Sequence, residues 1–245
     1  MENIIVRAAT ADDIHFAETI TTEMAESAKA RGTGIAKRSP DYIIQKMQEG
    51  KAVIALTKEG VWVGFCYIES WEHEKFVANS GLIVAPAFRK YGVATTIKHK
   101  IFELSRKKYP EAKIFGLTTG LAVMKINSDL GYEPVTYNQL TNDDQFWKGC
   151  QSCVNFEILT SKNRQNCMCT AMLYDPVEKA KEQELKKQQE VGPQNFWGRN
   201  LRNDNRVFDR WVRFKQFVLL KGRKKKEEGE AKDKKNSFLS FLFFS

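Results

Sequence analysis

Residues 79–120 contain an apolar segment, a glycine-containing turn, a helical segment and a second apolar segment, in that order. The sequence NSGLIVAPAF at 79–88 predicts a strand, and AKIFGLTTG at 112–120 predicts another. Between them, TTIKHKIFELSRKKY at 95–109 carries isoleucine and leucine at helical intervals. A strand–helix–strand order joins neighbouring strands by a crossover, so the chain must build a sheet with a helix packed on it.

The other segments add antiparallel strands and further helices to this unit. Two apolar runs joined by Lys-Glu-Gly predict a β-hairpin over residues 51–70. Thr10, followed three residues later by Asp13, is typical of a helix N-terminus. Helices are predicted at 11–30, 41–50 and 121–131, and further strands at 4–9, 132–137, 154–160 and 169–175. Together these elements predict an α+β (mixed α/β) fold.

Positive charge is concentrated in the C-terminal part of the chain. Of the formal net charge of +9, residues 176–245 carry +8, through 18 Lys/Arg and 10 Asp/Glu. We therefore expect a main domain over 1–140, a cysteine-containing β extension over 141–175, and a basic tail, helical or partly disordered, over 176–245. The tail predicts an anionic partner, such as nucleic acid, an acidic protein or a membrane surface, or else a solvated helical extension.

The N-terminal sequence, MENIIVRAATADD, has no basic region followed by an apolar stretch, so it does not resemble a signal peptide. No segment approaches the roughly 20 apolar residues of a membrane-spanning helix. The apolar ending, NSFLSFLFFS, is shorter than that. We therefore expect a cytoplasmic protein without a transmembrane segment, whose five cysteines are reduced thiols.

The turn at 89–94, RKYGVA, joins the predicted strand to the predicted helix. Backbone N–H groups at a helix N-terminus point outward unpaired, and the helix dipole adds partial positive charge. Gly92 would let a phosphate approach without a Cβ in the way, Ala94 is small, and Arg89 would add positive charge at the mouth. The turn is therefore a candidate phosphate cradle, with an ordinary strand-to-helix turn as the alternative.

Two separate blocks resemble one known family. GLIVAPAFRKYGVATTIKHKIFEL resembles the acetyl-CoA-binding motif of the GNAT superfamily of N-acyltransferases, R/Q-x-x-G-x-G/A after a strand, with its key positions at Arg89, Gly92 and Ala94. LAVMKINSDLGYEPV resembles the second block of the family, whose helix ends in the pair Gly131–Tyr132. The resemblance covers roughly residues 3–137 and implies a twisted, mostly antiparallel sheet flanked by helices.

This resemblance implies transfer of an acyl group, normally acetyl, from acyl-CoA to a primary amine. The backbone N–H groups of Arg89, Lys90, Tyr91, Gly92, Val93 and Ala94 would hold the pyrophosphate of the cofactor. The strand at 82–84 would splay from its neighbour and pair with the pantetheine arm, and an N–H near Val84 would polarise the thioester carbonyl.

The same resemblance implies an acid that protonates the leaving thiolate. Many family members carry a tyrosine where this chain has Asn127, which can hydrogen-bond the cofactor but is no acid. Tyr132 is our predicted catalytic acid, with Tyr137 or water as alternatives.

A general base is also needed, because the attacking amine must be neutral. The sequence IESWEHE offers Glu69, Glu72, His73 and Glu74 just before the motif strand, where many family members carry a carboxylate base. Glu69 is the predicted base because it lies at a strand end that should face the cleft. Solvated charge in a loop is the alternative for each of the four residues.

Four cysteines form two close pairs in the predicted extension. Cys150 and Cys153 form C-x-x-C, Cys167 and Cys169 form C-x-C, and a hairpin through the apolar run VNFEILT could bring the pairs together. Four thiolates in this arrangement suit a structural zinc ion. A redox pair, or four small buried residues, are the alternatives.

The acceptor and the tail leave two classes of function open. The first is an enzyme acting on the amine of a small molecule, such as the amino acid glutamate, or of a protein. The second is a GNAT-like binding or regulatory module without activity, attached to nucleic acid or a partner through its tail. Aromatic and basic residues between Phe196 and Phe217 could stack on bases, or could form an amphipathic helix that packs on the enzyme or on a second subunit of a homodimer.

Overall fold

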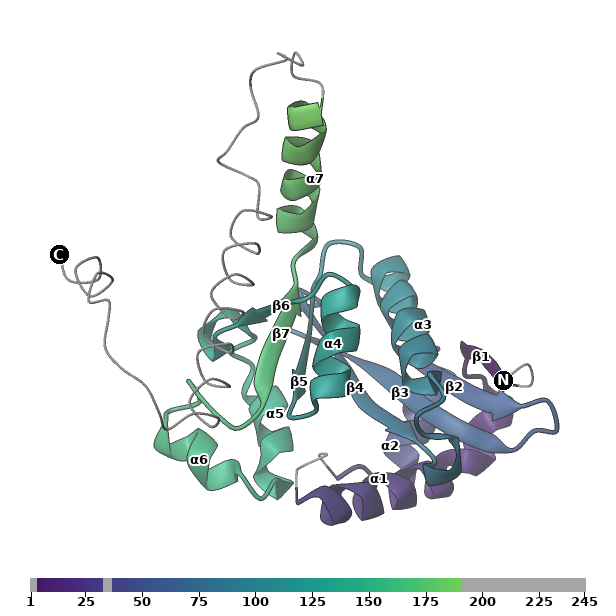
Figure 1. Ribbon diagram of the computed structural model, residues 1–245. Coiled ribbons are helices and arrows are strands. Elements are labelled where there is room, and N and C mark those ends of the chain that lie inside the picture. The colour runs from purple at the N-terminus through teal and green to yellow at the C-terminus, as the bar shows by residue number, and fades with distance from the viewer. Residues whose placement is uncertain (1–3, 33–36, 191–245) are drawn as a thin grey trace, which may run out of the picture. The chain divides into compact units, whose positions relative to one another are not determined.

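The computed structural model describes residues 4–32 and 37–190 (Figure 1). Its described strands form a seven-stranded sheet in the order β1-β2-β3-β4-β5-β7-β6. All neighbouring pairs are antiparallel except β4 and β5, which are parallel. The strands are β1 (Ile4–Ala8), β2 (Ala52–Thr57), β3 (Trp62–Trp71), β4 (Phe76–Val84), β5 (Lys113–Thr118), β6 (Glu133–Val135) and β7 (Thr170–Tyr174). This arrangement confirms the predicted mixed, mostly antiparallel sheet, including its single parallel crossover.

Helices cover both faces of the sheet, as Figure 1 shows. The α-helices are α1 (Ala17–Arg31), α2 (Pro40–Gln48), α3 (Val93–Lys108), α4 (Leu121–Asp129), α5 (Asp144–Lys148), α6 (Phe156–Ser161) and α7 (Pro176–Glu190). Shorter 3-10 turns lie at η1 (Ala11–Phe16), η2 (Pro86–Phe88), η3 (Tyr137–Gln139) and η4 (Gly149–Ser152). Helices α1 and α2 pack on one face of β2 and β3, and α3 packs on the other.

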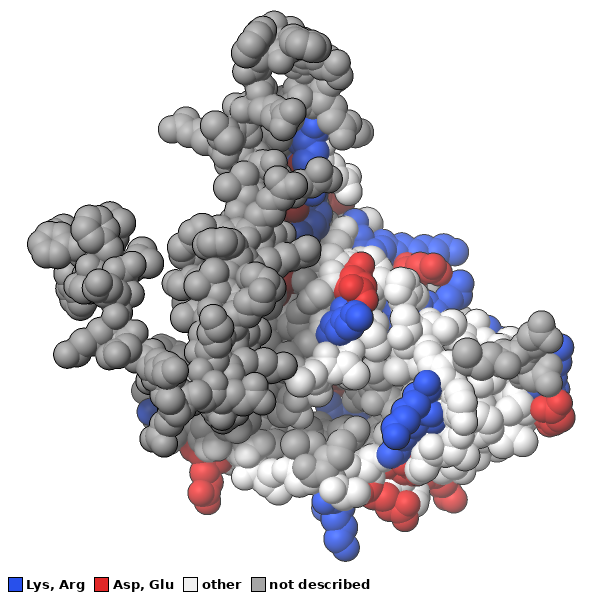
Figure 2. Space-filling model, in the orientation of Figure 1, with Lys and Arg blue, Asp and Glu red and all other residues white. Residues whose placement is uncertain are grey.

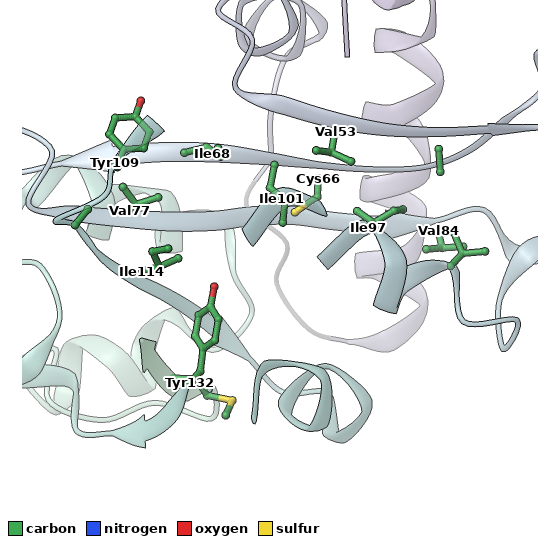
Figure 3. Close-up of a cluster of buried hydrophobic side chains, with 14 of the residues drawn as sticks. Val53, Cys66, Ile68, Val77, Val84, Ile97, Ile101, Tyr109, Ile114 and Tyr132 are labelled. Carbon is green, nitrogen blue, oxygen red and sulfur yellow. The ribbon is translucent and has the colours of Figure 1, made fainter. Parts of the chain in front are cut away.

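Strand β3 is buried on both faces because alternate residues enter different clusters. Val63 and Ile68 belong to the cluster under α3, whereas Phe65 and Tyr67 belong to the cluster under α1 and α2. Figure 3 shows the first of these clusters, with Ile68 beside residues from α3. A strand covered on both sides reads as a continuous apolar run, which explains the unbroken sequence WVGFCYI.

Helix α3 lies unusually close to β3. Ile97 and Ile101 are completely buried against the sheet. A Cβ added at Gly64 of β3 would lie 2.7 Å from Cδ1 of Ile97 and 2.8 Å from the backbone oxygen of Ile83. Only a residue without a side chain fits there, so Gly64 sets how closely the helix approaches the sheet.

Strands β4 and β5 pair over only part of their length. Their register joins Phe76–Ala78 to Lys113–Phe115, and beyond this point the two strands no longer pair. On its other side, β4 remains paired with β3 as far as Val84. The β3–β4 register shifts at Gly81, where β4 has one more residue than β3 between paired positions and φ is +66°. A bulge of this kind bends and twists its strand, which accounts for the parting of β4 from β5.

The strand predicted at 154–160 is wrong, because this segment contains helix α6. Its apolar residues Phe156 and Leu159 are three apart, so they lie on one side of a helix and pack into the cluster around β5 and β7. Short apolar runs of this length do not distinguish strand from helix. The segment 141–175 thus contains mostly helical turns, and only β7 fits the predicted β extension.

The first part of the predicted tail is helical, as α7. The rest of the tail lies outside the described residues. Within the described ranges, no helix combines the length and apolar character that a bilayer crossing requires. On the described surface in Figure 2, basic and acidic side chains are interspersed. This agrees with the near balance of 21 Lys/Arg and 20 Asp/Glu in residues 1–175.

Gly64→Ala should destabilise the fold by about 1–3 kcal/mol, because the added methyl group overpacks the contact between β3 and α3. Chemical denaturation followed by circular dichroism measures the loss. Gly116→Ala is the matched control, since its Cβ would lie 3.8 Å from the nearest atom, at ordinary contact distance. Equal stability of the two variants would contradict this account of the α3 contact.

Candidate active site

A cavity of about 290 Å³ lies where β4 and β5 part. Its walls come from Asn79–Leu82 of β4, from residues 116–119 in and after β5, and from α4. Since these two stretches no longer pair with each other, their facing backbone edges are available to a ligand that adds itself as an extended segment. The splaying predicted for the motif strand is therefore present.

The turn before α3 has the geometry expected of an anion cradle. Gly92 is the N-cap of α3 with φ at +80°, and no described atom lies within 4 Å of the position that its Cβ would take. Lys90 also has positive φ, at 68°, and Lys90 and Tyr91 are exposed. Val93 and Ala94 form the first turn of the helix, whose N–H groups have no intrahelical acceptors. The turn is thus open to solvent and to a ligand.

The side chain of Arg89 does not stand free at the mouth of this turn, as the sequence analysis expected. Its Nη2 donates to Glu23 at 2.7 Å and to Ser27 at 2.8 Å, and its Nε donates to the backbone oxygen of Val84 at 2.9 Å. The guanidinium therefore ties the turn to α1 and to the end of β4. Its charge is paired with Glu23, so the contribution of residue 89 to anion binding rests on its backbone.

Val84, the predicted oxyanion donor, is buried near the end of β4. Of the residues on that strand, the cavity wall includes Asn79, Ser80, Gly81 and Leu82. Leu82 is two residues from Val84 and so lies on the same side of the strand. The part of β4 that lines the cavity ends at Leu82, two residues before Val84.

Asn127 of α4 places an unpaired hydrogen-bond acceptor beside the cavity. The residue is 1% exposed and lines the cavity. Its Nδ2 contacts Sδ of Met172 at 3.7 Å, whereas its buried Oδ1 has no partner among the described residues. A buried acceptor without a donor costs about 1–3 kcal/mol. An amide N–H of a pantetheine arm would satisfy it, so Asn127 and the open turn at Gly92 both fit CoA.

Tyr132, the predicted catalytic acid, is not among the residues that line the cavity. It is 2% exposed and packs in the core under α3, where Figure 3 shows it near Ile114. Its hydroxyl donates to Oδ1 of Asn79 at 3.0 Å, and burial raises the pKa of the phenol well above its usual value. Its placement therefore gives no support to a role as acid.

Tyr137, the alternative acid, does line the cavity. Its hydroxyl donates to the backbone oxygen of Cys169 at 2.8 Å, and burial, followed by the neighbouring thiols, raises the pKa of the phenol. The proton of this hydroxyl is thus already engaged, and Tyr137 is a weaker acid than a free tyrosine.

Glu69, the predicted base, lies near the end of β3 and lines the cavity. It is 4% exposed, and its Oε1 accepts from Arg38 at 3.1 Å and from the hydroxyl of Tyr42 at 2.5 Å. Burial and the charge of Glu69 raise the pKa of Tyr42, so this phenol stays protonated and donating. No described residue donates to the second oxygen of Glu69, which is therefore available to a substrate.

The other three residues of the acidic cluster lie in the turn after β3, outside the cavity wall. Glu72, His73 and Glu74 all have positive φ. Oε1 of Glu72 accepts from the hydroxyl of Thr141 and from the backbone N–H of Asn142, both at 2.7 Å. Glu72 thus fixes the turn to the segment before α5, while His73 and Glu74 are exposed. Only Glu69 of the four candidates faces the cavity.

The four paired cysteines all lie in one wall of the cavity. They form no disulfide, and burial together with neighbouring thiols raises the pKa of Cys150 to about 11 and that of Cys169 to about 12. Within residues 4–32 and 37–190, no three His, Cys, Asp or Glu side chains are arranged to hold a metal ion. The structure thus brings the four cysteines into one wall of the cavity, although not by the predicted hairpin. It gives no support to the predicted zinc site.

No protein-family model and no curated protein matches this sequence. Solved structures do match. N-acetylglutamate synthase from Neisseria gonorrhoeae, complexed with CoA and N-acetyl-glutamate, is 14% identical with a TM-score of 0.50 over 70% of this chain and 35% of its own. Rv2747 from Mycobacterium tuberculosis, in complex with CoA, is 15% identical with a TM-score of 0.50, and the match covers 70% of this chain and 98% of that one. The chain has the fold of the GNAT acetyltransferases. A third structure, yncA from Salmonella typhimurium with its cofactor acetyl-CoA, is 15% identical with a TM-score of 0.50, and the match covers 71% of this chain and 94% of that one.

The GNAT fold confirms the resemblance on which the sequence interpretation rested. The described chain spans only about a third of the N-acetylglutamate synthase, so that protein's activity does not transfer as a whole. Sequence analysis missed several residues of the cavity, namely Arg38, Asn79, Ser80, Lys98 and Gly116. The expected splaying of the motif strand from its neighbour could have indicated Asn79, Ser80 and Gly116. Nothing in the sequence distinguishes Arg38 or Lys98 from other basic residues.

Arg38→Met should lower the free energy of unfolding by about 3 kcal/mol, because it leaves Glu69 as a buried carboxylate without its cation. The two side chains are 18% and 5% exposed, so solvent does not replace the lost partner. Urea denaturation measures the effect. Adding Glu69→Gln to this variant should restore most of the loss, and a double variant no more stable than the single one would contradict the coupling.

Proposed function

We propose that this chain is an acyl-CoA-dependent N-acyltransferase, with acetyl-CoA as the donor. The observation that carries the proposal is the parting of β4 and β5 beside the open N-terminus of α3. This arrangement offers an extended edge for the pantetheine arm and backbone N–H groups for the pyrophosphate. The GNAT fold, shared with proteins crystallised with CoA or acetyl-CoA, supports the same donor.

The donor would be held mainly by backbone groups. The turn from Arg89 to Ala94 would bind the pyrophosphate, and Oδ1 of Asn127 would accept from an amide of the arm. A backbone N–H of β4, between Leu82 and Val84, would polarise the thioester carbonyl. Because all of these contacts except that of Asn127 are made by the backbone, they are compatible with the low sequence identity to the matching structures.

Glu69 would take the proton of the acceptor, either directly or through a water molecule. Its Oε1 is held by Arg38 and Tyr42, which fixes the orientation of the carboxylate, and the residue lines the cavity. A positioned base of this kind normally contributes 10²–10⁴-fold to the rate, about the contribution that removal of the residue should reveal.

The acceptor that we propose is the primary amine of a small molecule, such as the amino acid glutamate, with a protein amine as the second candidate. One of the matching structures is an N-acetylglutamate synthase, which supports the first. The alternative of a non-catalytic module attached through the basic tail receives no support from the matching structures. The proposed anionic partner depends on the basic tail at 176–245 and the homodimer on the aromatic residues between Phe196 and Phe217, and residues 191–245 lie outside the described part of the chain.

Release of free CoA thiol in the presence of acetyl-CoA and a panel of amines tests the donor site. Gly116→Leu should reduce the release about 100-fold, because its side chain would fill the space between β5 and Asn127. Gly116→Ala should retain most of the activity. We prefer Gly116 to Gly92, because the positive φ of Gly92 would strain any side chain there. Full activity of a correctly folded Gly116→Leu would place the donor elsewhere.

Glu69→Gln should lower kcat by at least about 100-fold and leave the affinity for CoA unchanged, since it removes the base but no donor contact. Steady-state kinetics and calorimetric titration with CoA give the two quantities. Tyr42→Phe is the matched control, because it removes a hydrogen bond to the same carboxylate but keeps the carboxylate. A normal kcat for Glu69→Gln would exclude Glu69 as the base.

A further inference from the structure

Lys98, in the second turn of α3, is buried and lines the cavity. Only 2% of the residue is exposed, and it lies on the helix face that packs on the sheet, next to Ile97. Lysine is almost never buried to this degree without a partner, because its long chain normally carries the ammonium to water. Lys98 therefore requires an explanation other than packing.

No carboxylate among the described residues faces Lys98. Two titratable side chains do face it, Cys66 of β3 and Tyr132 after α4. Sγ of Cys66 donates to the backbone oxygen of Ser80 at 3.3 Å, and burial raises the pKa of this thiol to about 11. The ring of Tyr132 lies 5.3 Å from Nζ, and its hydroxyl donates to Asn79. Both neighbours are neutral, so the only electrostatic support they offer an ammonium is the face of an aromatic ring.

The other cation in the cavity wall is differently placed. Arg38 is bonded to Glu69 and Tyr67. In contrast, no hydrogen bond or ion pair joins Lys98 to another described residue, and burial lowers the pKa of its amine. A buried cation that faces a cavity and has no counter-ion is poised to bind a negative charge inside that cavity.

We propose that the ammonium of Lys98 binds the sulfur of CoA as it leaves, and so stabilises the negative charge that develops there. This inference rests on the proposed function. As the bond from the acceptor nitrogen to the acyl carbon forms, the carbon–sulfur bond breaks and the sulfur keeps the electron pair. The proton lost by the amine goes to Glu69 and then to solvent, and the thiolate is protonated by water after release. Lys98 keeps its own protons throughout.

The chemistry explains why a cation is useful here. The sulfur of the thioester is neutral before reaction and negative as it departs, so a nearby ammonium favours the departing state more than the bound donor. Asn127 cannot supply this charge, and the hydroxyl of Tyr137 already donates to Cys169. By linkage, the thiolate should raise the pKa of Lys98, and Lys98 should lower the pKa of the bound CoA thiol.

This reciprocity gives a test that needs neither turnover nor a known acceptor. CoA is bound to the full-length protein, and the ultraviolet absorbance of its thiolate is followed as a function of pH, with binding measured separately by calorimetry. In the wild-type protein we expect the pKa of the bound thiol to lie at least about one unit below that of free CoA, a tenfold larger thiolate fraction. Lys98→Met should abolish this shift. Lys100→Met is the matched control, because Lys100 is exposed and pairs with Glu103.

Each outcome of this experiment supports or excludes the proposed role of Lys98. If CoA binds and its thiol titrates like free CoA in the wild-type protein, the role of Lys98 is excluded while the proposed function stands, whether or not the variants fold. If Lys98→Met folds, binds CoA and keeps the shift, Lys98 is likewise excluded. If CoA does not bind to the wild-type protein, the inference fails together with the proposed function. Lys98→Gln replaces the methionine variant should that one not fold.

Discussion

The end of hydrogen bonding between β4 and β5 is the constraint on which the rest of the site depends. The strands pair from Phe76 to Ala78 and then separate, although each remains paired with its other neighbour. Backbone N–H and C=O groups inside a protein need partners, so two unpaired edges facing one cavity are stable only where solvent or a ligand can reach them. The bulge at Gly81 bends β4 away from β5, and the cavity lies where the two strands separate.

The charges around the cavity follow from the same geometry. Arg38, Glu69 and Tyr42 form one hydrogen-bonded group in and beside the cavity wall, so the carboxylate is oriented although it is buried. Arg89 is likewise occupied, by Glu23 and Ser27, and holds the turn at Gly92 in place. Lys98, in contrast, is buried and has no hydrogen bond or ion pair with another described residue.

Much of this fold could be predicted from the sequence. The β-hairpin, the crossover helix and the position of Gly92 follow from local rules on turns, periodicity and helix termini. The helix at Phe156–Ser161 could not, because an apolar run of six or seven residues suits a strand or a helix and its packing partners on β5 and β7 are distant in sequence. Within the site, the strand of the motif was predicted, but the contacts of its side chains were not.

Side-chain roles were harder to predict because they depend on partners from other elements. Arg89 meets Glu23 from α1, a contact over 66 positions that no motif contains. Lys98 and Lys100 stand two apart in TTIKHKIF, yet one is buried and the other exposed. Tyr132 matches its family position well, but its hydroxyl is directed to Asn79 in the core. A motif can therefore identify the loop that binds the donor more readily than the groups that perform the chemistry.

The close contact at Gly64 has a further consequence for α3. The helix begins at the turn that would hold the pyrophosphate, and Lys98 follows Val93 by five residues, about 7.5 Å along the axis. Both residues belong to one helix that packs closely on the sheet, so this separation is set by the helical rise. If the turn holds the pyrophosphate and Lys98 meets the sulfur, this separation sets the length of donor that fits, and one residue inserted between Val93 and Lys98 would move Lys98 by about 100° around the helix axis.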